Sequence, residues 1–136
     1  MSATIPAVRA SFPLVNIPSP TGSEGEVARE LHKIMQGAGF RSTLQAIGDE
    51  RYNAPGVLEG KGEGKSLMFN GHLDTVHLPF VPPRLEGDRL RGSGSSDMKA
   101  GTAAAVDALG PERVLLLPDG VEDHWNPDYA DLVALA

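Results

Sequence analysis

Apolar side chains recur at helical spacing between residues 21 and 39. Thr21 and Ser23 each precede a glutamate by three residues, which is the pattern of a capping box at a helix start. Gly37 and Gly39 supply a stop signal at the other end. The pattern predicts an amphipathic helix over 21–39, whose apolar face consists of Val27, Leu31, Ile34, Met35 and Ala38.

Shorter apolar runs predict strands. In residues 40–47 the apolar side chains fall on even-numbered positions, which point to one face of a strand, and this is typical of a strand whose other face is exposed. Residues 53–58 and 66–70 flank the glycine-rich EGKGEGK and predict two strands joined by a turn. The second run is continuously apolar over 67–69, which favours an interior strand. A further strand is predicted over 113–117.

Two more elements complete the pattern. RLEGDRLRG predicts a hairpin that turns at residues 87–88. KAGTAAAVDAL predicts a helix over 99–109, capped by Ser95 or Ser96 and ended by residues 110–111. Strands that alternate with helices indicate the α/β class, in which sites lie beyond the carboxyl ends of strands. The length of 136 residues predicts a single domain over 1–136.

Composition narrows the function classes. Twelve basic against eighteen acidic residues give a net charge of -6, without a basic run, so we expect no nucleic-acid partner. The chain has no cysteine, so a metal site would have to use histidine and carboxylate ligands. Its apolar runs are shorter than the roughly 20 residues of a membrane helix, and prolines interrupt the N-terminal stretch. We therefore expect a cytoplasmic protein without a membrane partner.

The motif GHLDTV follows the predicted interior strand 66–70. In an extended segment residues i and i+2 point to the same side, so His72 and Asp74 are expected to project together. A histidine that binds a metal usually donates its second ring N–H to an acceptor such as a carboxylate. Taken alone, the pair is more commonly a hydrogen-bonded loop histidine with an acidic neighbour.

A second motif, GSGSSDMKAG, places Asp97 just before the predicted helix 99–109. A carboxylate there is stabilised by the helix N-terminus as well as by any cation. By itself Asp97 is an ordinary capping residue. The presence of both motifs, in this order and separated by a loop and a hairpin, makes a shared site the better interpretation.

With these motifs and with LVNIPSPTGSEGEVARELHKIMQGAGF and Asn53, the chain resembles the zinc-dependent metallopeptidases and deacylases over roughly residues 12–109. This family includes aminoacylase, acetylornithine deacetylase, succinyl-diaminopimelate desuccinylase and glutamate carboxypeptidase. The resemblance implies part of a three-layer αβα catalytic domain, without the lid or dimerisation domain. It also implies a metal-dependent hydrolase of amide bonds that acts on small N-acyl amino acids or peptides.

The resemblance further implies a site for two zinc ions. His72 would ligate one ion, Asp97 would bridge both, and Asp74 would be the catalytic carboxylate that orients His72. Metals in such a site polarise the amide carbonyl and lower the pKa of a bound water. The family also implies a cis peptide between Asp97 and Met98.

The sequence departs from the family after the predicted strand 113–117. Where relatives place two adjacent glutamates, as general base and metal ligand, this chain has Gly120 and Val121. Glu122 and Asp123 are nearby candidates in a shifted register. We therefore expect 110–136 to be a divergent tail on an incomplete, truncated catalytic domain, with weak metal binding and little hydrolysis.

Two other features of the sequence favour rival interpretations. GKGEGKS ends like a phosphate-binding loop, but it has Glu59 where a glycine is needed and leads into a predicted strand. The stronger rival is a non-catalytic remnant or partner-binding protein that retains part of the fold. An unfinished sheet would expose edges and apolar surface, so self-association is a further expectation.

Overall fold

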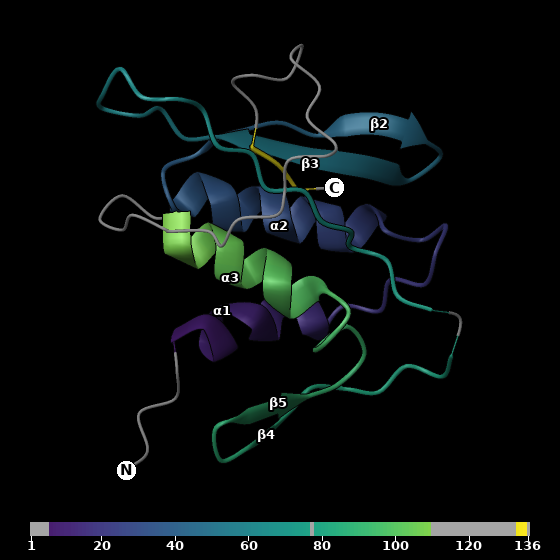
Figure 1. Ribbon diagram of the computed structural model, residues 1–136. Coiled ribbons are helices and arrows are strands. Elements are labelled where there is room, and N and C mark those ends of the chain that lie inside the picture. The colour runs from purple at the N-terminus through teal and green to yellow at the C-terminus, as the bar shows by residue number, and fades with distance from the viewer. Residues whose placement is uncertain (1–5, 77, 110–132, 136) are drawn as a thin grey trace.

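The structure, a computed structural model, describes residues 6–76, 78–109 and 133–135 (Figure 1). The predicted strand 113–117 and the candidates Glu122 and Asp123 lie outside these residues. The elements of the described part are α1 (Pro6–Val15), α2 (Gly25–Gly37), β1 (Arg41–Ser42), β2 (Gln45–Gly48), β3 (Arg51–Val57), β4 (Arg84–Glu86), β5 (Arg89–Arg91), α3 (Lys99–Leu109) and β6 (Val133–Leu135).

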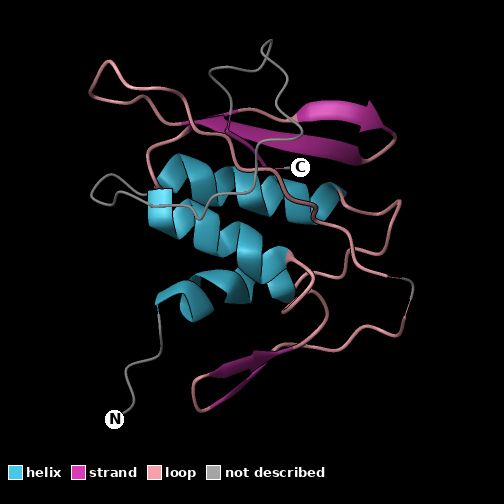
Figure 2. Cartoon of the chain, viewed as in Figure 1, coloured by secondary structure: helices cyan, strands magenta, loops and turns pink. Residues whose placement is uncertain are grey.

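The described elements are arranged as a sheet, a group of helices and a separate hairpin. Figures 1 and 2 show α2 next to the sheet that contains β2 and β3, with α3 and α1 following on the same side. The β4–β5 hairpin lies at the opposite end from the sheet. The described part thus mixes helices and strands, as the α/β prediction requires. Of the three expected layers it contains the sheet and the helical layer on one side of it.

The sheet is built around β3. β1 and β2 pair antiparallel with successive parts of β3, and the Thr43 amide donates to the carbonyl of Pro55 between them. The predicted strand 40–47 is therefore present as two short strands. The other edge of β3 pairs with β6, from Ala54 opposite Leu135 to Gly56 opposite Val133.

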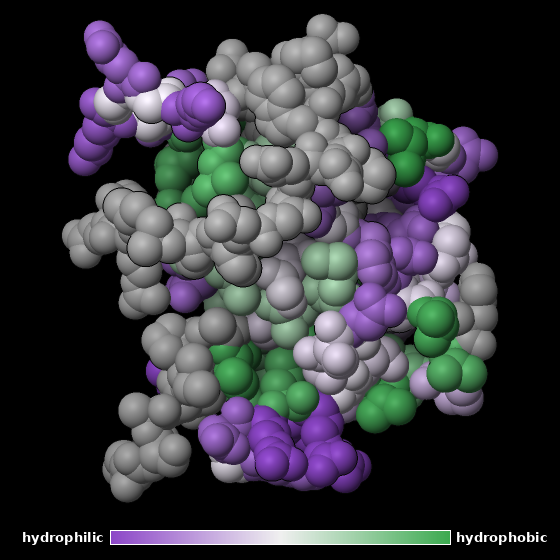
Figure 3. All heavy atoms as spheres, in the orientation of Figure 1, coloured by the Kyte–Doolittle hydropathy of each residue, from purple (hydrophilic) through white to green (hydrophobic). Residues whose placement is uncertain are grey.

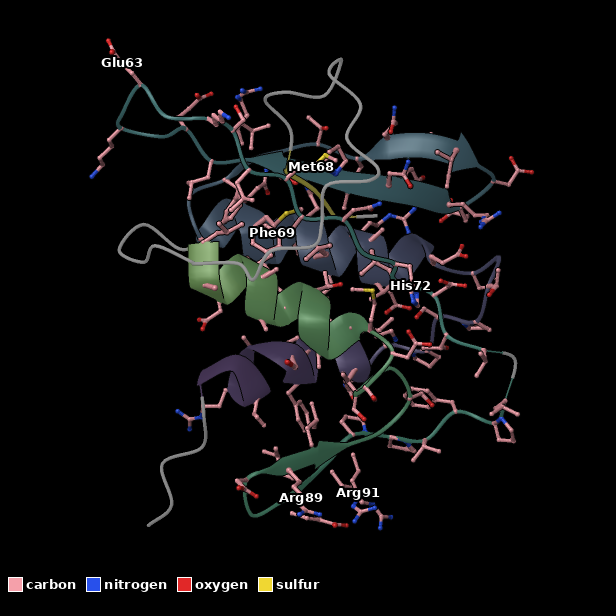
Figure 4. The ribbon with its side chains drawn as sticks, in the orientation of Figure 1. Glu63, Met68, Phe69, His72, Arg89 and Arg91 are labelled. Atoms are coloured by element: carbon pink, nitrogen blue, oxygen red, sulfur yellow. The ribbon has the colours of Figure 1, made fainter. Side chains whose placement is uncertain are left out.

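The prediction of an interior strand over 66–70 is wrong, because these residues adopt no regular secondary structure. The edge of β3 that a hairpin partner would need is taken by β6. The segment still lies partly within the protein, and Phe69 packs against the hydrophobic core. Figure 4 shows Met68 and Phe69 along this segment, above α3.

Helix α2 confirms the body of the predicted helix but not its start. It begins at Gly25, and its N-cap residue Glu24 makes no capping side-chain hydrogen bond. The predicted capping box is therefore wrong, and the Thr21 hydroxyl has another partner, described below. At the other end Gly39 adopts a φ of +88°, and the Phe40 amide donates to the carbonyl of Met35. This left-handed residue ends the helix as predicted.

Helix α1 was not predicted, because prolines interrupt its sequence. Pro6 is its first residue, where a missing amide hydrogen removes no helical bond, and Pro13 lies in its last turn. Helix α3 confirms the predicted bounds 99–109, and the β4–β5 hairpin confirms its prediction. The hairpin turns at Gly87, which has a φ of +65°, and pairs Leu85 with Leu90.

One hydrophobic core joins the three helices to β3. Buried side chains from every helix, from β3 and from the segments beside them meet there: Leu14, Val27, Ala28, Leu31, Met35, Phe40, Ala54, Leu73, Ala103 and Val106. None of the helices in the described part is long and apolar enough to cross a membrane.

A partly buried ion pair fixes the loop that leads into α2. Arg51 donates two hydrogen bonds to the Glu24 carboxylate, from Nε at 2.8 Å and from Nη2 at 3.0 Å. The Gly22 amide donates a third at 2.7 Å. Burial raises the pKa of Glu24, but the bonds from Arg51 and Gly22 outweigh it and hold the pKa below its ordinary value of 4.5.

Gly25 approaches the turn before β3 so closely that a side chain cannot be added. An added Cβ would lie 2.1 Å from the carbonyl oxygen of Glu50, which belongs to the backbone and cannot simply rotate away. We expect Gly25→Ala to lower the free energy of unfolding by roughly 3 kcal/mol. Denaturant unfolding measures this. In the control Gly37→Ala the added Cβ meets no atom within 4 Å, so a similar loss in that variant would contradict the explanation.

The Glu24–Arg51 pair predicts a pH dependence. A carboxylate whose folded pKa is lowered adds stability above its unfolded pKa, and this stability is lost as the pH falls through the folded pKa. We therefore expect the advantage of the parent over Glu24→Gln to be full at neutral pH and to shrink below about pH 4.5. Denaturant unfolding over a pH series tests this.

The control for this prediction is Glu63→Gln, on an exposed loop. Figure 4 shows the Glu63 side chain pointing away from the protein. Surface substitutions of this kind usually change stability by less than about 0.5 kcal/mol. An advantage of the parent over Glu24→Gln that stays constant in acid would contradict the role given to the Glu24 charge.

Candidate functional site

The buried side chain of Leu73 sets the orientation of the two residues of the candidate site that flank it. Leu73 belongs to the hydrophobic core, and its neighbours His72 and Asp74 therefore lie on the opposite side of the extended chain. The side chains of His72 and Asp74 are 46% and 31% exposed. Figure 4 shows His72 at the end of the extended segment, beside the start of α3. The alternation expected of GHLDTV is thus present without a strand.

His72 contacts both predicted acidic partners. Its Nε2 lies 2.9 Å from Oδ1 of Asp97, and its Nδ1 lies 2.9 Å from Oδ1 of Asp74. Nδ1 is also 3.1 Å from the backbone carbonyl of Asp74. Burial lowers the pKa of His72, but the hydrogen bonds to Asp97 and Asp74 outweigh it and raise the pKa above its ordinary value. The structure therefore brings His72, Asp74 and Asp97 into one cluster.

Asp97 is held at the end of a glycine-rich loop just before α3. Its peptide bond to Met98 is cis, as the family resemblance implies. Its side chain is 78% exposed, so solvent and ligands reach it. Gly71 lies close to the start of α3, because an added Cβ would come within 2.8 Å of the Met98 methyl group. This close approach brings His72 within reach of Asp97.

A short segment from Ile17 to Thr21, which we call the tether, connects both parts of the site. The tether runs beside residues 73–75: the Ser19 hydroxyl donates to the Leu73 carbonyl at 2.7 Å, and the Thr75 amide donates to the Ser19 carbonyl at 2.8 Å. The Thr21 amide donates to the Thr75 carbonyl at 3.2 Å. The tether therefore fixes the backbone on either side of Asp74.

Lys99 attaches the tether to the other part of the site. This lysine is fully buried, two residues after Asp97, and its Nζ donates to the carbonyl oxygen of Ile17. Ile17 follows the carboxyl end of α1, where the helix dipole favours a positive charge. Burial lowers the pKa of Lys99 to about 8. Gly94 leaves room for this side chain, since an added Cβ would lie 2.8 Å from the lysine Cδ.

Sequence reasoning missed the roles of Thr21 and Lys99. The capping-box pattern predicts Thr21 as a helix cap, but its hydroxyl donates to Oδ2 of Asp74. Lys99 was interpreted only as the first residue of a helix. The one sequence signal that could have pointed to this role is a lysine within the apolar MKAGTAAAV, whose long side chain can bury its carbon atoms. No local sequence pattern predicts that its hydrogen-bond partner is the carbonyl of Ile17, 82 residues earlier.

The donor set fits a zinc site in part. His72 Nε2 and Asp97 Oδ1 are ligand types that zinc prefers, and they converge from two segments. A catalytic zinc generally has three protein ligands, and residues 6–76, 78–109 and 133–135 contain no group of three or more candidates placed around one metal position. The described residues thus supply two donors and no complete site.

The surface around the site differs from that of the distant hairpin. Figure 3 shows hydrophobic side chains near the loop that leaves the site and hydrophilic ones over the β4–β5 hairpin. Val76, Leu78 and Val81 are exposed apolar residues of this loop. Arg89 and Arg91 of β5 point away from the body of the protein, far from His72 (Figure 4).

Comparisons with known proteins place the chain among peptidases and amide hydrolases. No model of a protein family matches it. It is 38% identical over 120 residues to a putative [LysW]-lysine/[LysW]-ornithine hydrolase of Pyrococcus abyssi, which covers 88% of this chain and 30% of that protein. It is 34% identical over 123 residues to carboxypeptidase G2 of Pseudomonas sp., which covers 82% of this chain and 28% of that protein.

A solved structure agrees with these relatives. The crystal structure of aminopeptidase PepT from Bacillus cereus matches with a TM-score of 0.63 and 25% identity, over 75% of this chain and 30% of that one. The chain therefore spans about 30% of the length of the proteins it matches. It belongs, as the sequence motifs indicated, to the M20 family of peptidases and deacylases, and it corresponds to the N-terminal part of their chains.

Proposed function

We propose that this chain carries part of the metal centre of an amide-bond hydrolase. In this proposal His72 and Asp97 are zinc ligands, and Asp74 is the carboxylate that orients His72. The observation that supports it best is the position of His72, with Nε2 against Asp97 and Nδ1 against Asp74. A ligand histidine needs this arrangement, because one nitrogen binds the metal and the other donates to an acceptor.

The chain's own residues would prepare the ligands. The backbone carbonyl and the carboxylate of Asp74 both lie close enough to Nδ1 of His72 to accept its proton, so that Nε2 would be the nitrogen that binds a metal. Asp97 offers an exposed carboxylate on the far side of Nε2. Zinc bound at these donors would polarise an amide carbonyl and lower the pKa of a bound water. The family resemblance suggests two such ions, with Glu122 and Asp123 as the remaining acidic candidates.

The proposed substrate is a small N-acyl amino acid or peptide. This follows from the relatives, which are named as a hydrolase of [LysW]-lysine and as a carboxypeptidase. The exposed cluster of His72 and Asp97 is accessible to such a molecule. The acidic net charge of -6 supports the expectation of no nucleic-acid partner.

A non-catalytic role is the alternative. It is favoured by the two-donor site of the described residues and by Gly120 and Val121 at the positions where the family pattern has two glutamates. In that case the cluster would be a remnant, and the chain would bind a partner or a second copy of itself. Zinc binding by the purified chain separates the two functions.

We expect the purified chain to bind zinc weakly, and His72→Ala and Asp97→Ala each to lose this binding. Equilibrium dialysis with metal analysis measures it. The matched control is His32→Ala, because His32 lies on α2 and contacts Ser42 at 2.9 Å, away from the cluster. Zinc binding that survives in both site variants, or that is lost equally in the control, would contradict the proposal. Release of amino acids from N-acyl substrates should stay near background.

A further inference from the structure

The extended segment that leads to His72 has an inner and an outer side. Phe69 and Leu73 pack against the hydrophobic core, and Gly71 between them lies against α3. Successive side chains of an extended chain point to opposite sides, so Asn70 and His72 belong to the outer side. Asn70 is exposed. Solvent therefore reaches this side chain, which lies on the same side of the segment as the candidate site.

Asn70 precedes a glycine, and asparagine side chains react most readily with their own backbone in this sequence. Glycine has no side chain to shield its amide nitrogen, and it adopts more backbone conformations than other residues. Packing also favours a glycine here, because an added Cβ at Gly71 would lie 2.8 Å from the Met98 methyl group. The fold thus favours the reactive Asn70–Gly71 pair at this position.

The backbone around the Asn70–Gly71 pair permits the reaction. Residues 66–74 adopt no helix or strand. Among the described residues, no backbone carbonyl accepts a hydrogen bond from the Gly71 amide. Regular structure and amide hydrogen bonds slow the reaction, because the nitrogen has to be free to attack and the chain has to turn toward the asparagine side chain. In the described part, neither of them restrains the Gly71 nitrogen.

We propose that Asn70 is a modification site, at which the chain converts spontaneously to aspartate or isoaspartate. The Gly71 nitrogen attacks Cγ of Asn70, and the new bond closes a succinimide ring. The bond from Cγ to Nδ2 breaks, and Nδ2 leaves as ammonia with the proton of the Gly71 amide. Water then opens the ring: cleavage between nitrogen and Cγ gives aspartate, and cleavage between nitrogen and the backbone carbonyl carbon gives isoaspartate.

Both products change the surface beside the candidate site. Each replaces a neutral amide by a carboxylate on the side of the segment that carries His72. In isoaspartate the chain runs through Cβ and Cγ, so one carbon is added to the backbone between Phe69 and Leu73, whose side chains pack in the core. His72 lies within this stretch. The reaction belongs to the chain itself and does not depend on the proposed function.

Peptide mass spectrometry tests the proposal in the folded full-length chain. During incubation in mildly alkaline buffer, conversion replaces the amino group of the Asn70 side chain by a hydroxyl group, and the mass gain is assigned to the peptide that contains it. Asn16 is an internal control: it is also exposed, but it precedes Ile17, whose amide donates to the Leu14 carbonyl at 3.3 Å. We expect Asn70 to convert faster than Asn16 by on the order of 10-fold, because a glycine follows it.

Two variants test the role of the glycine nitrogen. In Gly71→Ala a side chain shields this nitrogen, and we expect the conversion of Asn70 to slow about 10-fold. The Met98 methyl group is the end of a flexible side chain and moves aside for the new Cβ. In Asn70→Gln the longer side chain would have to close a larger ring, so we expect no mass gain at residue 70. Amide spectra verify the fold of both variants.

Incubation in concentrated urea separates the effect of the sequence from that of the structure. The unfolded Asn70–Gly71 pair reacts whatever the fold, and we expect the folded chain to convert as well. If Asn70 converted in urea but stayed intact in the folded chain, the proposal would be overturned, because the structure would then protect the pair. Conversion of Asn16 as fast as Asn70 in the folded chain, or an unchanged rate in Gly71→Ala, would overturn it too.

Discussion

The hydrogen bonds of the tether are the constraint that places the three site residues together. His72 and Asp74 follow an extended segment without ladder pairing, and Asp97 lies in a loop before α3. Neither location is rigid through its own secondary structure. Ser19 and Thr21 fix the backbone around Asp74, and Lys99 connects the start of α3 to the same segment. The site therefore depends on side chains that do not belong to it.

The buried amine of Lys99 illustrates how a fold can accommodate an unfavourable group. Transferring an ammonium group from water into a protein interior is costly unless hydrogen bonds and opposite charge compensate. In the described part, compensation comes from the Ile17 carbonyl and from the adjacent carboxyl end of α1. The lowered pKa of Lys99 shows that this compensation is incomplete. Packing α1 against α3 supplies the apolar contacts that hold the arrangement.

Elements with a local signal could be predicted from the sequence, and those that depend on distant partners could not. The body of α2, the helix α3 and the β4–β5 hairpin follow from periodicity and turn residues. The strand expected over 66–70 failed because β6 occupies the edge of β3. The prediction that Thr21 caps the helix failed because its hydroxyl donates a hydrogen bond to the carboxylate of Asp74, 53 residues away. Helix α1 was obscured by two prolines: Pro6 is its first residue, where no helical hydrogen bond is lost, and Pro13 lies two residues before its end.

The candidate site shows the same division. The motifs around His72, Asp74 and Asp97 were sufficient to predict a cluster, because their order and spacing resemble a known family. The resemblance did not predict the contacts of Thr21 and Lys99. No motif specifies which group binds a carboxylate oxygen of Asp74 or which carbonyl accepts a hydrogen bond from the amine of Lys99. Glu122 and Asp123, outside the described residues, remain predictions.

The tether also determines when the site can form. Its bonds join residues separated by 82, 54 and 53 positions in the chain. The entropy lost on closing such loops has to be compensated before these contacts become favourable, so they depend on prior collapse of the core. During synthesis Ile17 has to wait until Lys99 has left the ribosome. Assembly of the cluster is therefore part of global folding, and no isolated segment of the chain carries it.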